Sequence, residues 1–280
     1  MLEDRWLKLI TDNGTIDVQE EIPGLLFLGV RESPPVAITN NVQLQGIDGE
    51  LPGAVSYGPY ELTVNIGFDG YDIEDVELAE QKLRGMFNTR GRYYIVHSQM
   101  PGKKYAVDPP AIGTPEFLDA TALMFEITFV VYKGYSESLK DTSQFSLSSG
   151  EWQLEQNILA RDDIKYEHDI RYFQIYNGSS DTINPLMHHK LKIDIEINAP
   201  NGFSIVNLTN GNEFQYFKPL TSNDKLTILG VHPYLNNKRV GKNTNYDFLT
   251  LEPGFNEILI KGKGISNSPK TKFTFPFIYR

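Results

Sequence analysis

Leu191-Lys-Ile-Asp-Ile-Glu-Ile-Asn198 decides the fold class, because apolar and polar side chains alternate along it without interruption. Successive side chains of a β-strand point to opposite faces, so this period of two predicts an antiparallel strand with one buried and one solvated face. Residues 62–68 alternate in the same way. The run at residues 124–132 is apolar at several positions on both faces, which predicts a central strand that is covered on both sides.

Turn signals lie between these stretches. Asn-Gly and Asp-Gly pairs tolerate the positive φ angles that tight hairpins require. Many short strands at this spacing are typical of sandwiches and barrels. The pairs stand at residues 13–14, 48–49, 69–70, 177–178, 201–202 and 210–211.

One segment has a helical period instead. Val76, Ala79, Leu83 and Met86 recur at the spacing of one helix face, and several acidic residues stand in the first turn, where the helix dipole favours them. Asp72 or Asp75 is suited to cap the start. We therefore expect a helix over about 73–87, the only substantial helix of the chain, packed on the sheet of the first domain.

The composition changes after Tyr132. Residues 133–150 are rich in Ser, Gly and charge and poor in apolar side chains, which is typical of a linker. We expect a first domain at residues 1–138, a linker at 139–150 and a second domain at 151–280. The fold class is mostly β, with two antiparallel β-sandwich domains, the first of which carries the helix.

Several classes of site are excluded by residue type and spacing. The chain has no Cys, which rules out disulfides, thiolate metal sites and a cysteine nucleophile. None of the five His residues stands in a metal-binding motif. The N-terminus lacks the apolar run of a signal peptide, and no stretch reaches the length of a membrane span. We expect synthesis in the cytoplasm, no membrane insertion, no metal and no cofactor.

The sequence also lacks an obvious catalytic constellation. There is no GxSxG elbow, no P-loop and no GxGxxG. Asp162-Asp163 or Asp194 with Glu196 could be read as the acid and base of a glycoside hydrolase, but Asp194 and Glu196 share the solvated face of a strand with Lys192. We expect no catalytic residues. Aromatic residues near loops could instead form a platform for sugars: Tyr57, Tyr60, Tyr71, Tyr216, Tyr234 and Tyr246.

The order of several sequence blocks resembles the distal tail protein family of long-tailed (siphovirus) bacteriophages of Gram-positive hosts. In the first domain the blocks are ELTVNIGF at residue 61, KLRGMFN at 82, RYYIV at 92 and KYAVD at 104. In the second they are VNLTNGNEF at 206, DKLTILGVHP at 224, NKRVGKNTN at 237, LTLEPGFN at 249 and FTFPFIYR at 273.

This resemblance implies a role in virion structure. It implies a ring-forming N-terminal sandwich and a C-terminal sandwich of the galectin or carbohydrate-module type. Six copies would form a ring at the tail tip that joins the tail tube to the tail-associated tip protein, carries a receptor-binding protein in some phages, and lets DNA pass without specific binding. The protein would be assembled in the host cytoplasm. The alternatives are a carbohydrate-binding module that recognises a host cell-wall sugar and, third, a glycoside hydrolase.

Charge is shared unequally between the halves. Residues 1–138 carry 10 Lys and Arg against 21 Asp and Glu, a net charge of −11, whereas residues 139–280 have a net charge of +1. A basic channel lining would hold DNA phosphates, whereas an acidic or neutral lining lets DNA slide. An acidic patch around the helix supplies the candidates for the channel lining, with a surface exposed to solvent as the alternative: Asp69, Asp72, Glu74, Asp75, Glu77 and Glu80.

Overall fold

The computed structural model describes residues 5–119, 121–145, 152, 164–266 and 268–280. The chain divides into two compact units, residues 1–137 with residue 280 (unit 1) and residues 138–279 (unit 2). The expected division into two domains that fold separately stays a prediction, because a division by contacts does not test independent folding.

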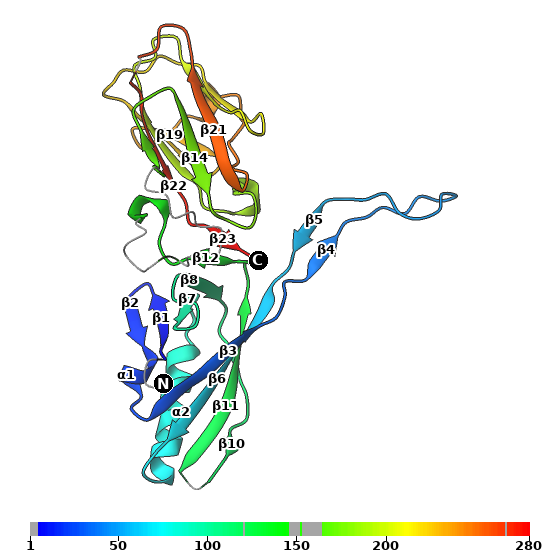
Figure 1. Ribbon diagram of the computed structural model, residues 1–280, viewed down its shortest axis with the longest axis vertical. Coiled ribbons are helices and arrows are strands. Elements are labelled where there is room, and N and C mark those ends of the chain that lie inside the picture. Colours follow the sequence, from blue (N-terminus) through cyan, green and yellow to red (C-terminus); the bar gives the residue numbers. More distant parts are fainter. Residues whose placement is uncertain (1–4, 120, 146–151, 153–163, 267) are drawn as a thin grey trace. The chain divides into compact units, whose positions relative to one another are not determined.

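Unit 1 is built on one antiparallel sheet with the strand order β2-β1-β7-β8-β11-β6-β3, and the short strands β9 and β10 also pair with β11 (Figure 1). Two further strands, β4 and β5, form a separate hairpin. The elements of unit 1 are β1 (Leu7–Thr11), β2 (Gly14–Asp17), α1 (Val18–Glu21), β3 (Leu25–Glu32), β4 (Ala37–Thr39), β5 (Val55–Tyr57), β6 (Tyr60–Asp69), α2 (Ile73–Phe87), β7 (Tyr93–His97), β8 (Lys103–Val107), β9 (Ala111–Ile112), β10 (Glu116–Phe117) and β11 (Ala122–Val131), and β12 (Ser136–Ser138) stands at the boundary of the units.

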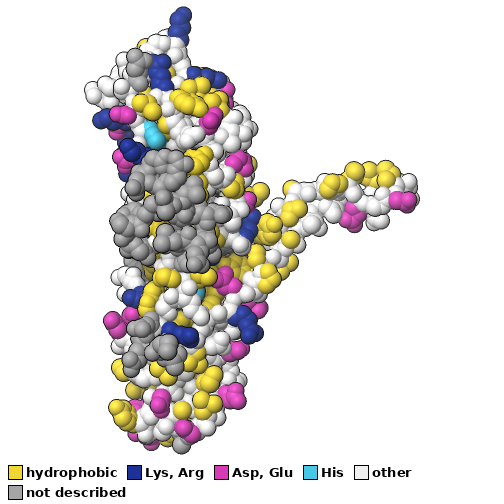
Figure 2. All heavy atoms as spheres, in the orientation of Figure 1, with side chains coloured by type: hydrophobic (Ala, Val, Ile, Leu, Met, Phe, Trp, Pro, Cys, Tyr) yellow, Lys and Arg dark blue, Asp and Glu magenta, His cyan; other side chains and the backbone are white. Residues whose placement is uncertain are grey.

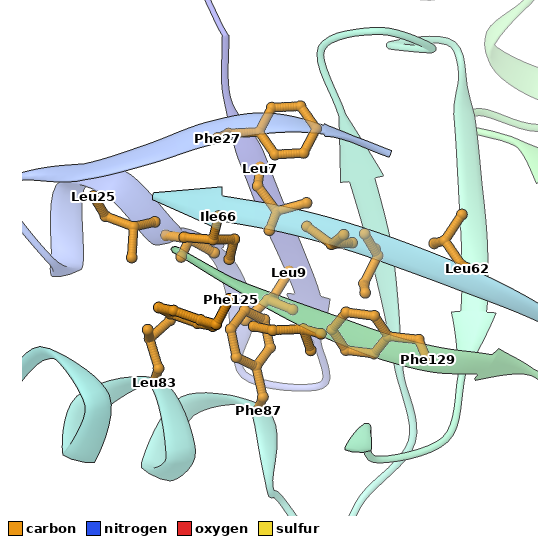
Figure 3. Packing of buried hydrophobic residues seen from close by; sticks show 14 of the residues in the cluster. Leu7, Leu9, Leu25, Phe27, Leu62, Ile66, Leu83, Phe87, Phe125 and Phe129 are labelled. Atoms are coloured by element: carbon orange, nitrogen blue, oxygen red, sulfur yellow. The ribbon is translucent and has the colours of Figure 1, made fainter. Parts of the chain in front are cut away.

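The helix expected over about 73–87 is present as α2, and its start follows the expected chemistry. The Asp72 carboxylate accepts a hydrogen bond from the backbone N–H of Asp75 at 2.9 Å, which satisfies one of the free donors of the first turn. One face of α2 is buried against the sheet, and Figure 3 shows Leu83 and Phe87 pointing toward Phe125 and Phe129. Phe87 and Phe129 meet edge to face, with ring centroids 5.5 Å apart.

The central strand β11 is covered on one face only, so the expectation of cover on both faces is wrong. Its side chains alternate between buried and exposed, with Phe125, Ile127 and Phe129 in the core and Met124 and Glu126 on the open side. The strand pairs with β6 on one edge and with β8, β9 and β10 on the other. It is therefore central in its hydrogen bonding, while its second face has no covering layer among the described residues.

Unit 2 is a sandwich of two antiparallel sheets. One sheet has the order β13-β22-β15-β18-β19-β20, and the other has the order β14-β21-β16-β17. The stretch 191–198 that decides the fold class contains β15. The elements are η1 (Thr142–Gln144), β13 (Glu167–His168), β14 (Tyr172–Asn177), η3 (Pro185–Met187), β15 (Lys192–Glu196), β16 (Phe203–Asn207), β17 (Glu213–Tyr216), β18 (Lys225–Leu229), β19 (His232–Leu235), β20 (Lys238–Arg239), η4 (Gly241–Asn243), β21 (Gly254–Lys261), β22 (Lys270–Thr274) and β23 (Ile278–Tyr279).

Buried asparagines hold the chain that enters β21. The Asn256 side chain is fully buried, and its Nδ2 donates to the carbonyl oxygens of Glu252 and Gly254 at 2.7 and 3.2 Å. Its Oδ1 accepts from the backbone N–H of Glu252 at 2.8 Å and from Asn207 Nδ2 at 2.9 Å. A buried amide is stable only when its donors and acceptors are used, and here they fix the turn at residues 252–256.

The described part of the expected linker, residues 139–145, packs onto unit 2. Thr142 is buried, its N–H donates to the carbonyl oxygen of Phe275 at 3.0 Å, and its hydroxyl donates to that of Phe273 at 2.9 Å. Ser138, just before this segment, donates its N–H to the carbonyl oxygen of Phe277 at 2.8 Å, and its Oγ accepts from the Phe277 N–H at 2.9 Å. Side-chain hydroxyls thus hold this segment against unit 2 although it has few apolar residues. The amino-acid composition of the segment does not predict such packing. Residues 146–150 lie outside the described residues.

Candidate assembly surface

A long hairpin extends from the sheet of unit 1 (Figure 1), and we call residues 33–59 the arm. It continues the pairing of β3 with β6. The N–H of Ser33 donates to the carbonyl oxygen of Glu61 at 2.9 Å, and that of Gly58 donates to Val36 at 2.8 Å. Beyond this point β4 pairs with β5, and Val42 pairs with Leu51 through two hydrogen bonds of 3.0 and 2.9 Å. The arm is thus a two-stranded ribbon.

The arm exposes apolar side chains along its length (Figure 2). All residues of the arm are described, and none of them belongs to the buried cluster of unit 1. An isolated two-stranded hairpin is marginally stable in water, and a contiguous apolar surface on a soluble protein marks an interaction site. The arm is therefore a candidate interaction surface. Its large exposed apolar residues are Val36, Ile38, Val42, Leu44, Ile47, Leu51, Val55 and Tyr57, each between 42% and 63% exposed.

The charge of the arm is confined to one place. Asp48 and Glu50 are its only charged residues, and both stand near the turn at the tip. Glu50 accepts a hydrogen bond from Asn41 Nδ2 at 3.0 Å. The rest of the ribbon combines apolar side chains with uncharged polar groups, so a surface that covers it has no need of strong opposite charge.

The open face of the β3–β6–β11 sheet is a second uncovered surface of unit 1. The pairing register sets Leu26, Gly67 and Met124 in one row across the three strands. Leu26 is 42% exposed and Met124 is 38% exposed. Another row carries Thr63 and Thr128, whose hydroxyls lie 3.5 Å apart. The open face thus has apolar side chains at both ends of β11, at Met124 and Val130, with the Glu126 carboxylate and the Thr128 hydroxyl between them.

Five of the six acidic residues expected to line a channel lie on α2 or at its start, and α2 packs on the side of the sheet opposite this open face, whereas Asp69 is the last residue of β6. Three of the six have local partners: Asp72 caps the helix, Asp75 accepts from the N–H of Tyr71 at 3.1 Å, and Glu80 pairs with Arg84. Asp69, Glu74 and Glu77 are exposed. Only these three have carboxylates that combine exposure with no local partner among the described residues, and of the other three only Glu80 is paired with a cation.

The five histidines are dispersed. His97 is buried in unit 1 between Phe27 and Tyr105, while His168 stacks on Phe173 in unit 2 with ring centroids 4.3 Å apart. His189 is buried, and its Nδ1 lies 3.0 Å from the backbone N–H of Asn184. Among the residues that the structure describes, no three His, Asp or Glu side chains form a group that could hold a metal ion. No helix in the described ranges is long and apolar enough to span a membrane.

Asp194 and Glu196 lie on the solvated face of β15, as the alternation predicts. Burial alone would raise the pKa of Asp194, but hydrogen bonds from Lys192 and Thr227 and the charge of Lys225 hold it below its usual value. A carboxylate held ionised by lysines is a poor proton donor, which argues against a glycosidase acid at this position. Asp162 and Asp163 lie outside the described residues.

The six candidate tyrosines do not form one platform. Tyr60 and Tyr216 are buried, and Tyr57 and Tyr71 stand at different places in unit 1. Tyr246 is 77% exposed in unit 2. Sequence reasoning missed Phe217, which is 54% exposed beside β17. The signal was present, because Glu213, Gln215 and Phe217 alternate with the buried residues of the same strand.

Comparison with known proteins confirms the resemblance to phage tail proteins. Residues 12–131 match the family model described as the phage tail protein RIFT-related domain. The fold is similar to the crystal structure of the SPP1 Dit (gp 19.1) protein, which is described as a paradigm of the hub adsorption apparatus in phages that infect Gram-positive hosts. The TM-score is 0.65 at 12% identity, over 97% of this chain and 99% of that one. The expected mostly β fold class is thereby confirmed.

A chain of the phage P2 baseplate in its activated conformation with Ca also matches, with a TM-score of 0.42 at 12% identity over 98% of both chains. No curated protein sequence matches the chain.

Proposed function

We propose that this chain is a structural hub of a phage tail tip, because residues 12–131 match a phage tail protein domain and the fold is similar to that of a distal tail protein. The role is non-catalytic, the location is the virion tail, and assembly takes place in the host cytoplasm. The observation that carries the proposal is the arm, because a 27-residue ribbon with exposed apolar side chains is stabilised when another protein surface covers those side chains.

The partner that covers the arm is a second copy of this chain. The open face of the β3–β6–β11 sheet offers exposed apolar side chains at Leu26 and Met124, which match the apolar side chains of the arm. A contact between two different patches is heterologous, and such contacts close into rings when the rotation per copy is right. The resemblance to distal tail proteins sets the number of copies in this proposal at six, a homo-hexamer.

The ring joins the tail tube to the tail-associated tip proteins, and a receptor-binding protein is a further candidate partner. DNA passes through the ring without specific binding. Glu74 and Glu77, which are exposed on α2, and Asp69, at the end of β6, are the acidic candidates for this passage, since the carboxylates of Asp72, Asp75 and Glu80 have local partners. An exposed carboxylate near DNA repels phosphates and disfavours arrest.

The arm is tested by molecular mass in solution. Val42→Ser with Val55→Ser removes two exposed apolar side chains from the arm, and Leu186→Ser with Leu208→Ser removes two from unit 2 as a matched control. We expect the wild type and the control to form rings, alone or with the tail-tube protein, and the arm variant to remain a monomer with an unchanged melting temperature. An arm variant that assembles like the wild type contradicts the proposal.

The channel lining is tested by reversing charge on either side of the sheet. Glu77→Lys changes the α2 side, and Glu126→Lys changes the open face. If the α2 side lines the passage, Glu77→Lys slows DNA ejection from assembled virions and Glu126→Lys leaves it unchanged, because added positive charge binds phosphates. The opposite result assigns the lining to the open face of the sheet and removes the acidic residues from it.

A further inference from the structure

A polar groove lies on the outer face of the four-stranded sheet of unit 2, and we call it the β17 groove. It has a volume of about 490 Å³, which is within the range of small-ligand sites. The pairing register sets Gln215, Ser204 and Lys261 side by side on β17, β16 and β21. Three strands of a rigid sheet therefore present an amide, a hydroxyl and an ammonium group to the same space.

A carboxylate joins this row. Glu213 Oε1 accepts a hydrogen bond from Gln215 Nε2 at 2.8 Å, and Lys261 Nζ lies 3.1 Å from the same oxygen. The hydrogen bond from Gln215 is the main reason that the pKa of Glu213 lies below its usual value, so the group is an ionised acceptor at neutral pH. Donors and acceptors thus alternate within one small area.

An aromatic ring stands beside this polar floor. Phe217 also lines the groove and is 54% exposed. Its backbone is fixed, because its N–H donates to the carbonyl oxygen of Asn243 at 2.9 Å. Gly202 lies against it with a φ of +76°, and a Cβ at that position would stand 2.2 Å from the Tyr216 carbonyl oxygen. A glycine is required here so that the neighbouring turn can support the chain that carries Phe217.

The combination of groups selects the class of ligand. Glutamate only accepts, lysine only donates, and the amide and the hydroxyl do both, so a ligand that satisfies all four needs closely spaced donors and acceptors. Phe217 adds the requirement of an apolar face. A phosphate is negatively charged and would be repelled by the Glu213 carboxylate, and an apolar side chain would leave the polar row unpaired. A sugar ring carries hydroxyls at its rim and C–H groups on its face.

We propose that the β17 groove binds a hexopyranose unit of a glycan, with the sugar ring stacked on Phe217 and its hydroxyls bonded to Glu213, Gln215 and Lys261. This activity goes beyond the hub role and does not depend on ring formation, because every residue involved belongs to one unit of one chain.

The test is saturation-transfer NMR on the full chain with a panel of methyl hexopyranosides, including N-acetylated ones. Inorganic phosphate and a hexose 6-phosphate form separate arms. We expect at least one uncharged hexopyranoside to bind. Phe217→Ala and Gln215→Ala should each weaken that binding by about tenfold or more, and Phe217→Trp should keep it. Tyr172→Ala, which removes another half-exposed aromatic side chain from the same unit, should have no effect.

Because Phe217 and Gln215 are not part of the buried core, their variants should melt at the temperature of the wild type, which separates loss of binding from loss of folding. Three results would overturn the proposal. They are absence of transfer from the whole panel, equal binding by Phe217→Ala, and binding of phosphate or the hexose 6-phosphate without binding of any uncharged sugar.

Discussion

His97 should make the stability of unit 1 depend on pH. Its side chain is 2% exposed, and both ring nitrogens lack a hydrogen-bond partner among the described residues. The ring stacks on Tyr105 with centroids 5.4 Å apart and also faces Phe27. Burial, with a smaller contribution from the charge of Lys103, lowers the pKa of His97 from 6.5 to about 4. Glu32, which accepts a hydrogen bond from Tyr105, is the nearby acidic group.

The sign follows from proton binding in the two states. Between about pH 6.5 and pH 4 the unfolded chain binds a proton at His97 that the folded unit does not, so stability falls as the pH falls through this window. With these two pKa values the loss is about 2 kcal/mol at pH 5 and approaches about 3.4 kcal/mol below pH 4. For a unit of this size, about 2 kcal/mol corresponds to a fall in melting temperature of roughly 6–10 °C.

The assay compares the wild type with His97→Phe by urea unfolding of the full chain at pH 7.5 and pH 5. The two Trp residues, Trp6 in unit 1 and Trp152 in unit 2, report separately when either is replaced by Phe. We expect the unit 1 transition of His97→Phe to lose about 2 kcal/mol less between the two pH values than that of the wild type. Carboxylates and His168 titrate in both proteins, so their effects cancel in the difference. Equal pH dependence in the two proteins would refute the reasoning.

Two further predictions concern unit 2. Asn256→Ala should destabilise it by about 3 kcal/mol, because the hydrogen bonds to Glu252, Gly254 and Asn207 are lost from a buried site. Asn223→Ala, at an exposed position, is the control and should cost less than about 0.5 kcal/mol. Equal urea midpoints for the two variants would contradict the role of the buried amide. Gly202→Ala should destabilise unit 2 by at least about 2 kcal/mol more than Gly211→Ala, since both glycines have positive φ but only a Cβ at Gly202 meets a backbone oxygen, at 2.2 Å. Thermal melting of the two variants measures the difference, and the same melting temperature in both would show that the backbone moves away.

Local patterns predicted the regular elements well. The alternation at 191–198 corresponds to β15, and the helical period with Asp72 at its start corresponds to α2. These features depend on neighbours in sequence, so the sequence carries them directly. The cover of a strand depends on what packs above it, which is why the apolar character of β11 wrongly suggested two buried faces: Met124 and Val130 are apolar and 38% exposed.

Features that depend on contacts between residues distant in the sequence were harder to predict. The arm contains a recognisable hairpin turn at Asp48-Gly49, but no local pattern tells a hairpin that packs on a core from one that does not. The packing of Thr142 rests on bonds to residues more than a hundred positions away. The β17 groove likewise draws its polar groups from three strands, and Lys261 is distant in sequence from Gln215.

The arm also has a consequence for the subunit before it assembles. Two strands with exposed edges and apolar side chains are a template for uncontrolled β-pairing between chains. Asp48 and Glu50 place negative charge at the tip, so two arms that approach end to end repel each other. The two residues thus resemble the charged gatekeeper residues that flank aggregation-prone segments. No such charge protects the shaft of the ribbon. A free subunit is therefore prone to aggregate at high concentration, and rapid capture of the arm by its proper partner surface determines how much of the newly made protein stays soluble.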